Sequence, residues 1–103
     1  IVVMGHEGCG AIKSAIAGVE LGNITAMLEH IDPAIEMTDN FPEDQRTVEN
    51  KEYVSAVTKN NVLHTIDEIK KNSSIIAEME QNNEIKIVGA VYNVNTGSVE
   101  WLQ

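Results

Sequence analysis

The alternation of apolar and polar positions divides the chain into short buried strands and amphipathic helices. Residues 1–4 (IVVM) form a continuous apolar run rich in β-branched side chains, which is typical of a strand buried on both faces. A glycine-rich turn follows at 5–10, and residues 11–17 then predict a helix that Gly18 ends. Strand, turn and helix in this order form the first half of a βαβ unit.

Three further helices are expected. The first covers residues 23–30, the second covers about 47–71, and the third is short, with Ser73 as its N-cap, Gln81 near its end and Asn82-Asn83 as its stop. In the first two helices, apolar side chains recur at helical spacing and fall on one side of the helix. These side chains are Ile24, Met27, Leu28 and Ile31 in the first helix, and Val54, Val57, Val62, Ile66 and Ile69 in the second. Residues 32–46 hold both prolines and five acidic residues, so a surface connection with at most a short helical turn is expected there.

The end of the chain predicts a second strand and a hairpin. Residues 85–94 (IKIVGAVYNV) are again apolar and β-branched. Asn95, Thr96 and Gly97 suit a tight hairpin with Gly97 in a left-handed conformation, and residues 98–103 then return antiparallel with Val99 and Trp101 on one face. The expected fold is α/β, with a parallel sheet core, an antiparallel C-terminal edge strand and flanking helices.

Composition narrows the class of protein. A chain of 103 residues forms one domain at most, and its 43% hydrophobic content is that of a globular protein. No apolar run reaches the length of a bilayer span, so we expect no membrane-embedded segment. The formal charge of −9 repels phosphate backbones, and we therefore expect no binding to nucleic acid.

The single cysteine and the first residue bear on the setting of the protein. Cys9 cannot form an internal disulfide, which suits a reducing compartment, and we expect a cytoplasmic location. The chain begins at Ile1, inside an apolar run and without an initiator methionine. We therefore expect that residues are missing upstream, and any targeting signal would be missing with them.

His6 and Cys9 are the candidate chemical site. Neutral imidazole and thiolate are zinc ligands, and a His-x-x-Cys pair across a turn can bring both to one ion. The pair follows a predicted parallel strand and precedes a helix, which is where open α/β sheets collect ligands. The positive end of that helix favours a thiolate, and the neighbouring glycines let the backbone approach a ligand closely. A buried cysteine beside a hydrogen-bonded histidine is the simpler alternative.

Other interpretations of this turn have less support. Gly5, Gly8 and Gly10 give G-x-x-G-x-G, the reverse of the dinucleotide-binding fingerprint, and no Walker lysine follows. A redox-active Cys9 has no second cysteine to resolve it. A phosphatase-like loop needs an arginine about six residues after the cysteine, where this chain has Ala15. His30 and His64 lack neighbours at ligand spacing, so we expect them to be structural.

Two blocks of the sequence resemble the β-class carbonic anhydrases. Residues 2–16 (VVMGHEGCGAIKSAI) are similar to that family's second zinc-ligand segment, a strand followed by G-H-x-x-C-G-[AG]. Residues 61–102 are similar to its closing block, in which a helix beginning N-V and a Ser-capped helix precede I-x-G-A-x-Y-x-x-x-T-G-x-V. The two blocks cover more than half of the chain, whereas residues 32–50 match no family motif.

The resemblance implies a role for four residues. His6 and Cys9 match the zinc-binding histidine and cysteine, and Gly10 matches the glycine whose backbone borders the carbon dioxide pocket. Tyr92 matches a tyrosine of the last long strand, to which we assign packing. The family's third protein ligand and its gating pair lie in a Cys-x-Asp-Ser-Arg segment about fifty residues before the histidine, and this chain starts too late to contain it. Residues 1–103 would then be the C-terminal portion of a single domain.

The resemblance therefore implies a zinc-dependent carbonic anhydrase that interconverts carbon dioxide and bicarbonate in the parent protein. No catalytic residue of its own is expected in the present chain, which should be inactive alone because two ligands leave zinc half-held. The alternative is a non-catalytic α/β module with an interaction or regulatory role. The resemblance also places the strand at 1–6 beside a strand that this chain lacks. We therefore expect a homo-oligomer, joined through that open edge or by exchanged segments.

Overall fold

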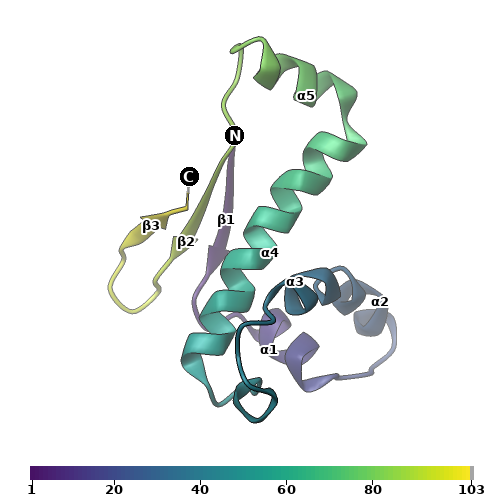
Figure 1. Ribbon diagram of the computed structural model, residues 1–103, viewed down its shortest axis with the longest axis vertical. Coiled ribbons are helices and arrows are strands. Elements are labelled where there is room, and N and C mark those ends of the chain that lie inside the picture. Colours follow the sequence, from purple (N-terminus) through teal and green to yellow (C-terminus); the bar gives the residue numbers. More distant parts are fainter. Residues whose placement is uncertain (103) are drawn as a thin grey trace.

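The computed structural model describes residues 1–102 as a three-stranded sheet with one long helix packed on one side of it and shorter helices packed on that helix (Figure 1). The strands are β1 (Val2–His6), β2 (Val88–Tyr92) and β3 (Val99–Trp101). The helices are α1 (Gly10–Ala17), α2 (Asn23–Glu29), α3 (Asp32–Met37), α4 (Lys51–Asn72) and α5 (Ser74–Gln81), with a 3₁₀ turn, η1, at Glu43–Gln45. Among residues 1–102, no helix is both long and apolar enough to cross a membrane. The predicted α/β class is confirmed.

The sheet has the order β1-β2-β3, with β1 parallel to β2 and β3 antiparallel to β2. This is the expected parallel pair with an antiparallel edge strand, although the last position of the predicted 98–103 return lies outside the described residues. The pairing of β1 with β2 continues beyond the strand ends, because the amide of Val88 donates to the carbonyl of Ile1 at 2.9 Å. The hairpin before β3 also has the expected form. Gly97 adopts a left-handed φ of 75°, and its amide donates to the carbonyl of Asn93 at 2.8 Å.

Helix α4 lies against the sheet at two glycines. Gly5 of β1 and Gly89 of β2 face it, and a Cβ at Gly89 would come within 2.9 Å of Cγ1 of Val62. A Cβ at Gly5 would lie 3.0 Å from the other methyl group of the same valine. Because neither glycine has a side chain, the helix backbone can approach the strands closely, and Val62 and Ile66 are buried between them.

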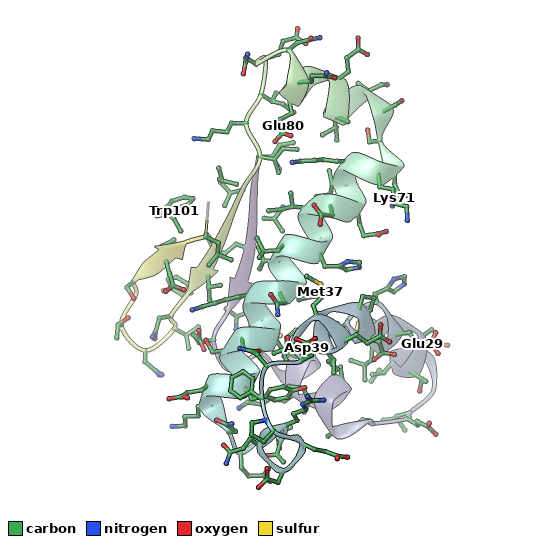
Figure 2. The ribbon with its side chains drawn as sticks, viewed as in Figure 1. Glu29, Met37, Asp39, Lys71, Glu80 and Trp101 are labelled. Carbon is green, nitrogen blue, oxygen red and sulfur yellow. The ribbon has the colours of Figure 1, made fainter. Side chains whose placement is uncertain are left out.

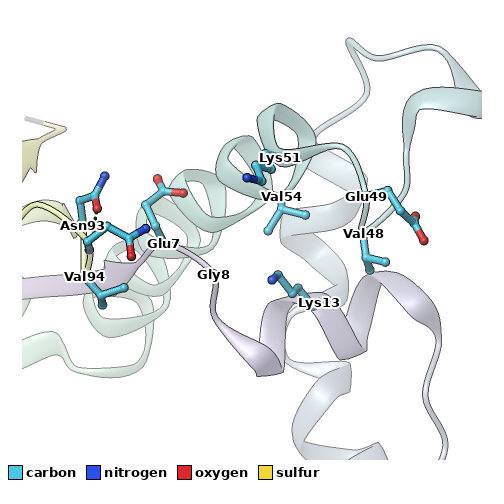
Figure 3. Close-up of a pocket in the computed structure, with 10 residues that line it drawn as sticks. Glu7, Gly8, Lys13, Val48, Glu49, Lys51, Val54, Asn93 and Val94 are labelled. Atoms are coloured by element: carbon cyan, nitrogen blue, oxygen red, sulfur yellow. Dashed lines mark hydrogen bonds between the residues drawn. The ribbon is translucent and has the colours of Figure 1, made fainter.

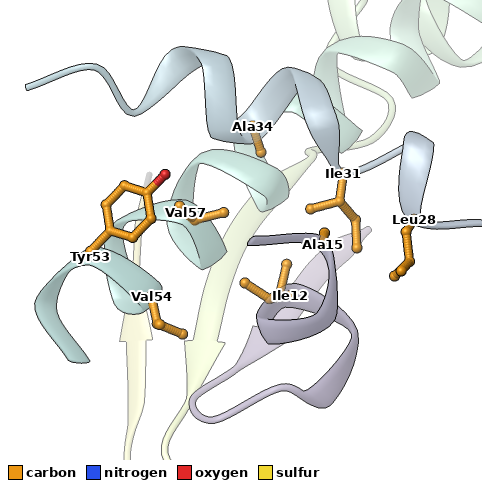
Figure 4. Packing of buried hydrophobic residues seen from close by; sticks show 8 residues of the cluster. All are labelled: Ile12, Ala15, Leu28, Ile31, Ala34, Tyr53, Val54 and Val57. Carbon is orange, nitrogen blue, oxygen red and sulfur yellow. The ribbon is translucent and has the colours of Figure 1, made fainter. Parts of the chain in front are cut away.

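The first half of α4 contributes to a second apolar cluster, formed with α1, α2 and α3 (Figure 4). Its buried members are Ile12, Ala15, Leu28, Ile31, Ala34, Tyr53, Val54 and Val57. The helical spacing of Val54, Val57, Val62 and Ile66 is thus confirmed as a buried face, but one that serves two different clusters along its length. Together the two clusters attach the helical region and the sheet to the same helix.

The expected surface connection over residues 32–46 is wrong in its first part. Residues 32–37 form helix α3, and Pro33 is tolerated in its first turn, where the missing N–H costs nothing. The segment is also partly buried: Thr38 is 1% exposed, donates to the carbonyl of Ala34 at 2.7 Å and accepts from Nδ2 of Asn60 at 2.7 Å. Further along, Phe41 packs edge-to-face on Tyr53, with ring centroids 5.3 Å apart.

Two apolar surfaces remain open among the described residues. Of the four apolar residues expected on one side of the helix at 23–30, Leu28 and Ile31 are buried. Ile24 and Met27 are exposed, so that side is only half covered. The side of the sheet opposite α4 is also open, and the three strands contribute no Asp, Glu, Lys or Arg side chain to it. Met4 is 52% exposed there and Trp101, which lies on the side away from α4 in Figure 2, is 59% exposed.

We predict that Gly89→Ala destabilises the fold by about 1–3 kcal/mol, because the new methyl group overlaps Val62 in a packed core. Chemical denaturation measures this change. The matched control is Gly10→Ala, since no heavy atom lies within 4 Å of a Cβ at that position, and it should leave stability nearly unchanged. In Gly89→Ala/Val62→Ala the two losses should be less than additive. Strict additivity would contradict the close contact.

Candidate metal and carbon dioxide site

The structure places His6 and Cys9 at the two ends of one short turn. His6 is the last residue of β1, and Cys9 is the N-cap of α1. Gly8 between them adopts φ of 70°, which lets the chain reverse from strand to helix within two residues. The Cys9 side chain makes no capping hydrogen bond, so its sulfur is not engaged with the helix backbone. Both predicted ligands therefore lie at the carboxyl end of β1, as expected.

A cavity of about 180 Å³ lies beside this turn, between β1, α1 and α4. His6 and Cys9 both line it, and Thr58 and Asn61 of α4 add polar groups. The remaining lining residues are Met4, Gly5, Ile12 and Ile31. Gly10, the predicted substrate-pocket residue, is the exposed first residue of α1 and is not among the lining residues. The cavity is small, mainly apolar and adjacent to both candidate ligands.

The His6 ring is held by the backbone of the next residue. Its Nδ1 lies 3.1 Å from the carbonyl oxygen of Glu7. A carbonyl oxygen only accepts, so this contact requires the proton on Nδ1 and leaves the lone pair of the neutral ring on Nε2. Metal-binding histidines commonly donate their second nitrogen to a carbonyl in this way. His6 thus has the tautomer that a metal ligand needs.

Glu7 fixes the turn through three separate groups. Its amide donates to the carbonyl of Tyr92 on β2 at 2.9 Å, and its carboxylate accepts from the hydroxyl of Ser55 on α4 at 3.0 Å. Its carbonyl accepts from His6. Sequence analysis did not identify Glu7 or Ser55, because the two are 48 residues apart and neither belongs to a recognisable motif. Glu7 joins the candidate ligand to the sheet and to α4.

The donor set fits part of a zinc site. Imidazole nitrogen and thiolate are suitable ligands, but a structural or catalytic zinc takes at least three from protein. Within residues 1–102 no group of three or more His, Cys, Asp or Glu side chains is placed to hold a metal ion. His30 is the exposed C-cap of α2, and His64 is half-buried on α4; neither lines the cavity. The described residues therefore offer two ligands, and further ligands would have to come from elsewhere.

The family of the chain is established by comparison with known proteins. The family model described as carbonic anhydrase matches residues 1–99. The chain belongs to the carbonic anhydrase family. A search of curated proteins found no match.

Solved structures with a similar fold include two β-carbonic anhydrases of the fungus Aspergillus fumigatus. CafA is 21% identical with a TM-score of 0.79, and the match covers 99% of this chain and 47% of CafA. Wild-type CafD is 21% identical with a TM-score of 0.68, and the match covers 100% of this chain and 56% of CafD. This carbonic anhydrase chain thus shares their fold and spans about half of their length.

We predict that Ser55→Ala loosens the turn, because it leaves the half-buried Glu7 carboxylate without its hydroxyl donor. The expected loss of stability is about 1 kcal/mol. The Nδ1–H tautomer of His6 should become less populated, which ¹⁵N NMR of the imidazole measures directly. Ser74→Ala on α5, an exposed position, is the matched control. An unchanged His6 tautomer in Ser55→Ala would show that Glu7 does not orient the ring.

Proposed function

We propose that this chain is part of a zinc-dependent β-class carbonic anhydrase that interconverts carbon dioxide and bicarbonate. The family match and the fold shared with β-carbonic anhydrases support the proposal. The observation that carries it is the arrangement of His6 and Cys9, both lining one cavity, with Nδ1 of His6 bonded to a carbonyl. A reducing compartment would keep Cys9 unoxidised and available as a ligand, and we propose the cytoplasm.

In this proposal Nε2 of His6 and the sulfur of Cys9 hold the metal. Zinc would supply an acidified water as the nucleophile for carbon dioxide. Ile12 and Ile31 give the adjoining cavity apolar walls, which suit a small uncharged substrate. The backbone of Gly10, the uncapped first residue of α1, would border that substrate. The remaining protein ligands would come from polypeptide outside residues 1–102.

A non-catalytic carbonic-anhydrase-like module is the second candidate. It is favoured by the finding that the described residues assemble only two ligands of the required kind. In such a module the fold would serve binding to another protein, and the His6–Cys9 turn would be a remnant. Metal binding and activity of the chain, with and without added polypeptide, separate the two candidates.

We predict that the chain alone retains little zinc after dialysis and hydrates carbon dioxide no faster than buffer with the same zinc. The zinc-binding free energy of a two-ligand site should fall far short of the roughly 10–16 kcal/mol reached by full structural zinc sites. Metal analysis and stopped-flow hydration measure the two quantities. Any residual zinc should be lost in His6→Ala and in Cys9→Ser, and should be unaffected in the control His30→Ala.

Two outcomes would overturn parts of this proposal. Stoichiometric zinc that resists a chelator and disappears in Cys9→Ser would show that a complete site forms, with ligands from a second copy. Activity that persists at full strength in Cys9→Ser would show that the site lies elsewhere. A family member with its full ligand set that loses zinc upon the equivalent of Cys9→Ser supports catalysis over the non-catalytic module.

We also propose that the chain forms homo-oligomers. Strand β1 pairs with β2 on one side, and its opposite edge carries backbone N–H and C=O groups able to pair with another chain. The adjoining open side of the sheet includes Met4 and Trp101, and the strands contribute no Asp, Glu, Lys or Arg to it. The formal charge of −9 opposes association, but ordinary salt screens it beyond about 8–10 Å.

We predict that sedimentation at tens of micromolar shows a dimer or larger species. Met4→Lys should shift the equilibrium towards monomer, because it places a charge on the open side of the sheet. Lys86→Met, which instead removes a charge from an exposed position outside the strands, should not. A clean monomer in the unmodified chain would refute the proposal of self-association.

A further inference from the structure

A second and larger cavity, of about 660 Å³, lies on another side of the His6–Cys9 turn (Figure 3). It shares no lining residue with the cavity beside His6 and Cys9. Its walls come from five parts of the chain: the turn itself, α1, the segment that leads into α4, the start of α4, and the β2–β3 hairpin. The lining residues that matter for its chemistry are two lysines, three valines, two asparagines and two glutamates.

The two lysines are the main electrostatic feature of this cavity. Lys13 comes from α1 and Lys51 from the first turn of α4, and both direct their ammonium groups towards the cavity in Figure 3. Among residues 1–102 the ion pairs are Lys59–Glu100 at 3.0 Å and Lys70–Glu80 at 2.9 Å, so neither Lys13 nor Lys51 belongs to one. Acidic residues outnumber basic ones 16 to 7 in this chain. The cavity thus brings together two lysines that belong to no ion pair and two glutamates, a basic share well above that of the chain as a whole.

Neither glutamate forms an ion pair with these lysines. The Glu7 carboxylate accepts a hydrogen bond from Ser55 at 3.0 Å and is held at α4, and Glu49 directs its carboxylate away from the lysines in Figure 3. The carboxylate oxygens of both glutamates lie more than 4.0 Å from the lysine ammonium nitrogens, which is too far for an ion pair. Each ammonium thus retains donors that an anionic ligand can accept from.

The rest of the wall suits a ligand with a short carbon body. Val48, Val54 and Val94 supply apolar surface between the charged groups. Asn93 adds a donor, because its Oδ1 already accepts from the amides of Asn95 at 2.9 Å and Thr96 at 3.2 Å, which leaves its NH₂ group for a ligand. A bare inorganic anion would contact the ammonium groups and leave the valines uncovered.

We propose that this cavity binds a small dicarboxylate of short chain length, with one carboxylate at Lys13, the other at Lys51, and the carbon chain against the valines. Ligand binding there uses neither His6 nor Cys9, and it is therefore independent of the proposed carbonic anhydrase function. Because Glu7 and Gly8 line the cavity, an occupant would contact the turn that carries both candidate metal ligands.

The test is a titration of the metal-free chain with succinate, followed by calorimetry and by NMR of the backbone amides. Lys13→Met and Lys51→Met keep an apolar stem and remove one charge each, and each should weaken binding about tenfold, the effect of losing one charged hydrogen bond. Lys71→Met removes a charge near the other end of α4 (Figure 2) and should leave binding unchanged. Circular dichroism checks that each variant is folded.

Two further ligands separate charge from shape. Butyrate lacks one carboxylate and inorganic phosphate lacks the carbon chain, so both should bind more weakly than succinate. Phosphate binding as tight as that of succinate would overturn the assignment to a dicarboxylate. Equal weakening in Lys71→Met, or none in Lys13→Met and Lys51→Met, would overturn the site. In the unmodified chain, succinate should shift the amides of Gly8, Val54 and Asn95, and absence of these shifts would also overturn it.

Discussion

The close contact between α4 and the sheet is the constraint on which the rest of the structure depends. Gly5 and Gly89 leave no room for a side chain, so Val62 touches both strands and the helix axis is set close to the sheet. Once α4 is placed there, its first half extends beyond the strands and becomes the surface on which α1, α2 and α3 pack. Helix α4 therefore determines where the helical region meets the carboxyl end of β1. The candidate site lies at this junction.

The candidate site uses this placement directly. Helix α4 presents Ser55 to the carboxylate of Glu7, and Thr58 and Asn61 to the cavity beside His6 and Cys9. The amide of Glu7 bonds to the sheet and its carboxylate bonds to α4, and its carbonyl accepts from the His6 ring. The ring is therefore positioned relative to both the sheet and α4. The ring tautomer is thus set by contacts within the protein. Such preorganisation lowers the entropy lost when a ligand binds.

The two cavities beside the turn have different chemistry because different side chains of α1 and α4, and different further segments, line them. The smaller one lies along the edge of β1 and receives apolar residues from α1 and from the start of α3. The larger one receives Lys13 from the outer side of α1, Lys51 from the start of α4 and polar residues from the β2–β3 hairpin. Glu7 and Gly8 of the turn line the larger cavity, whereas His6 and Cys9 line the smaller one.

The sequence by itself determined the features that local chemistry controls. Gly18 ends α1, Gly97 adopts the expected left-handed conformation, Ser73 caps α5, and the apolar runs form the paired strands. The motif around His6 and Cys9 also identified the family that residues 1–99 match. Local patterns did not reveal α3, because Pro33 and the acidic residues favour a loop unless the burial of Ala34 and Thr38 against neighbouring helices compensates. Only the tertiary structure decided the Glu7–Ser55 contact, the exposure of Ile24 and Met27 and the gathering of Lys13 and Lys51 at one cavity, because each depends on which distant segment packs beside it.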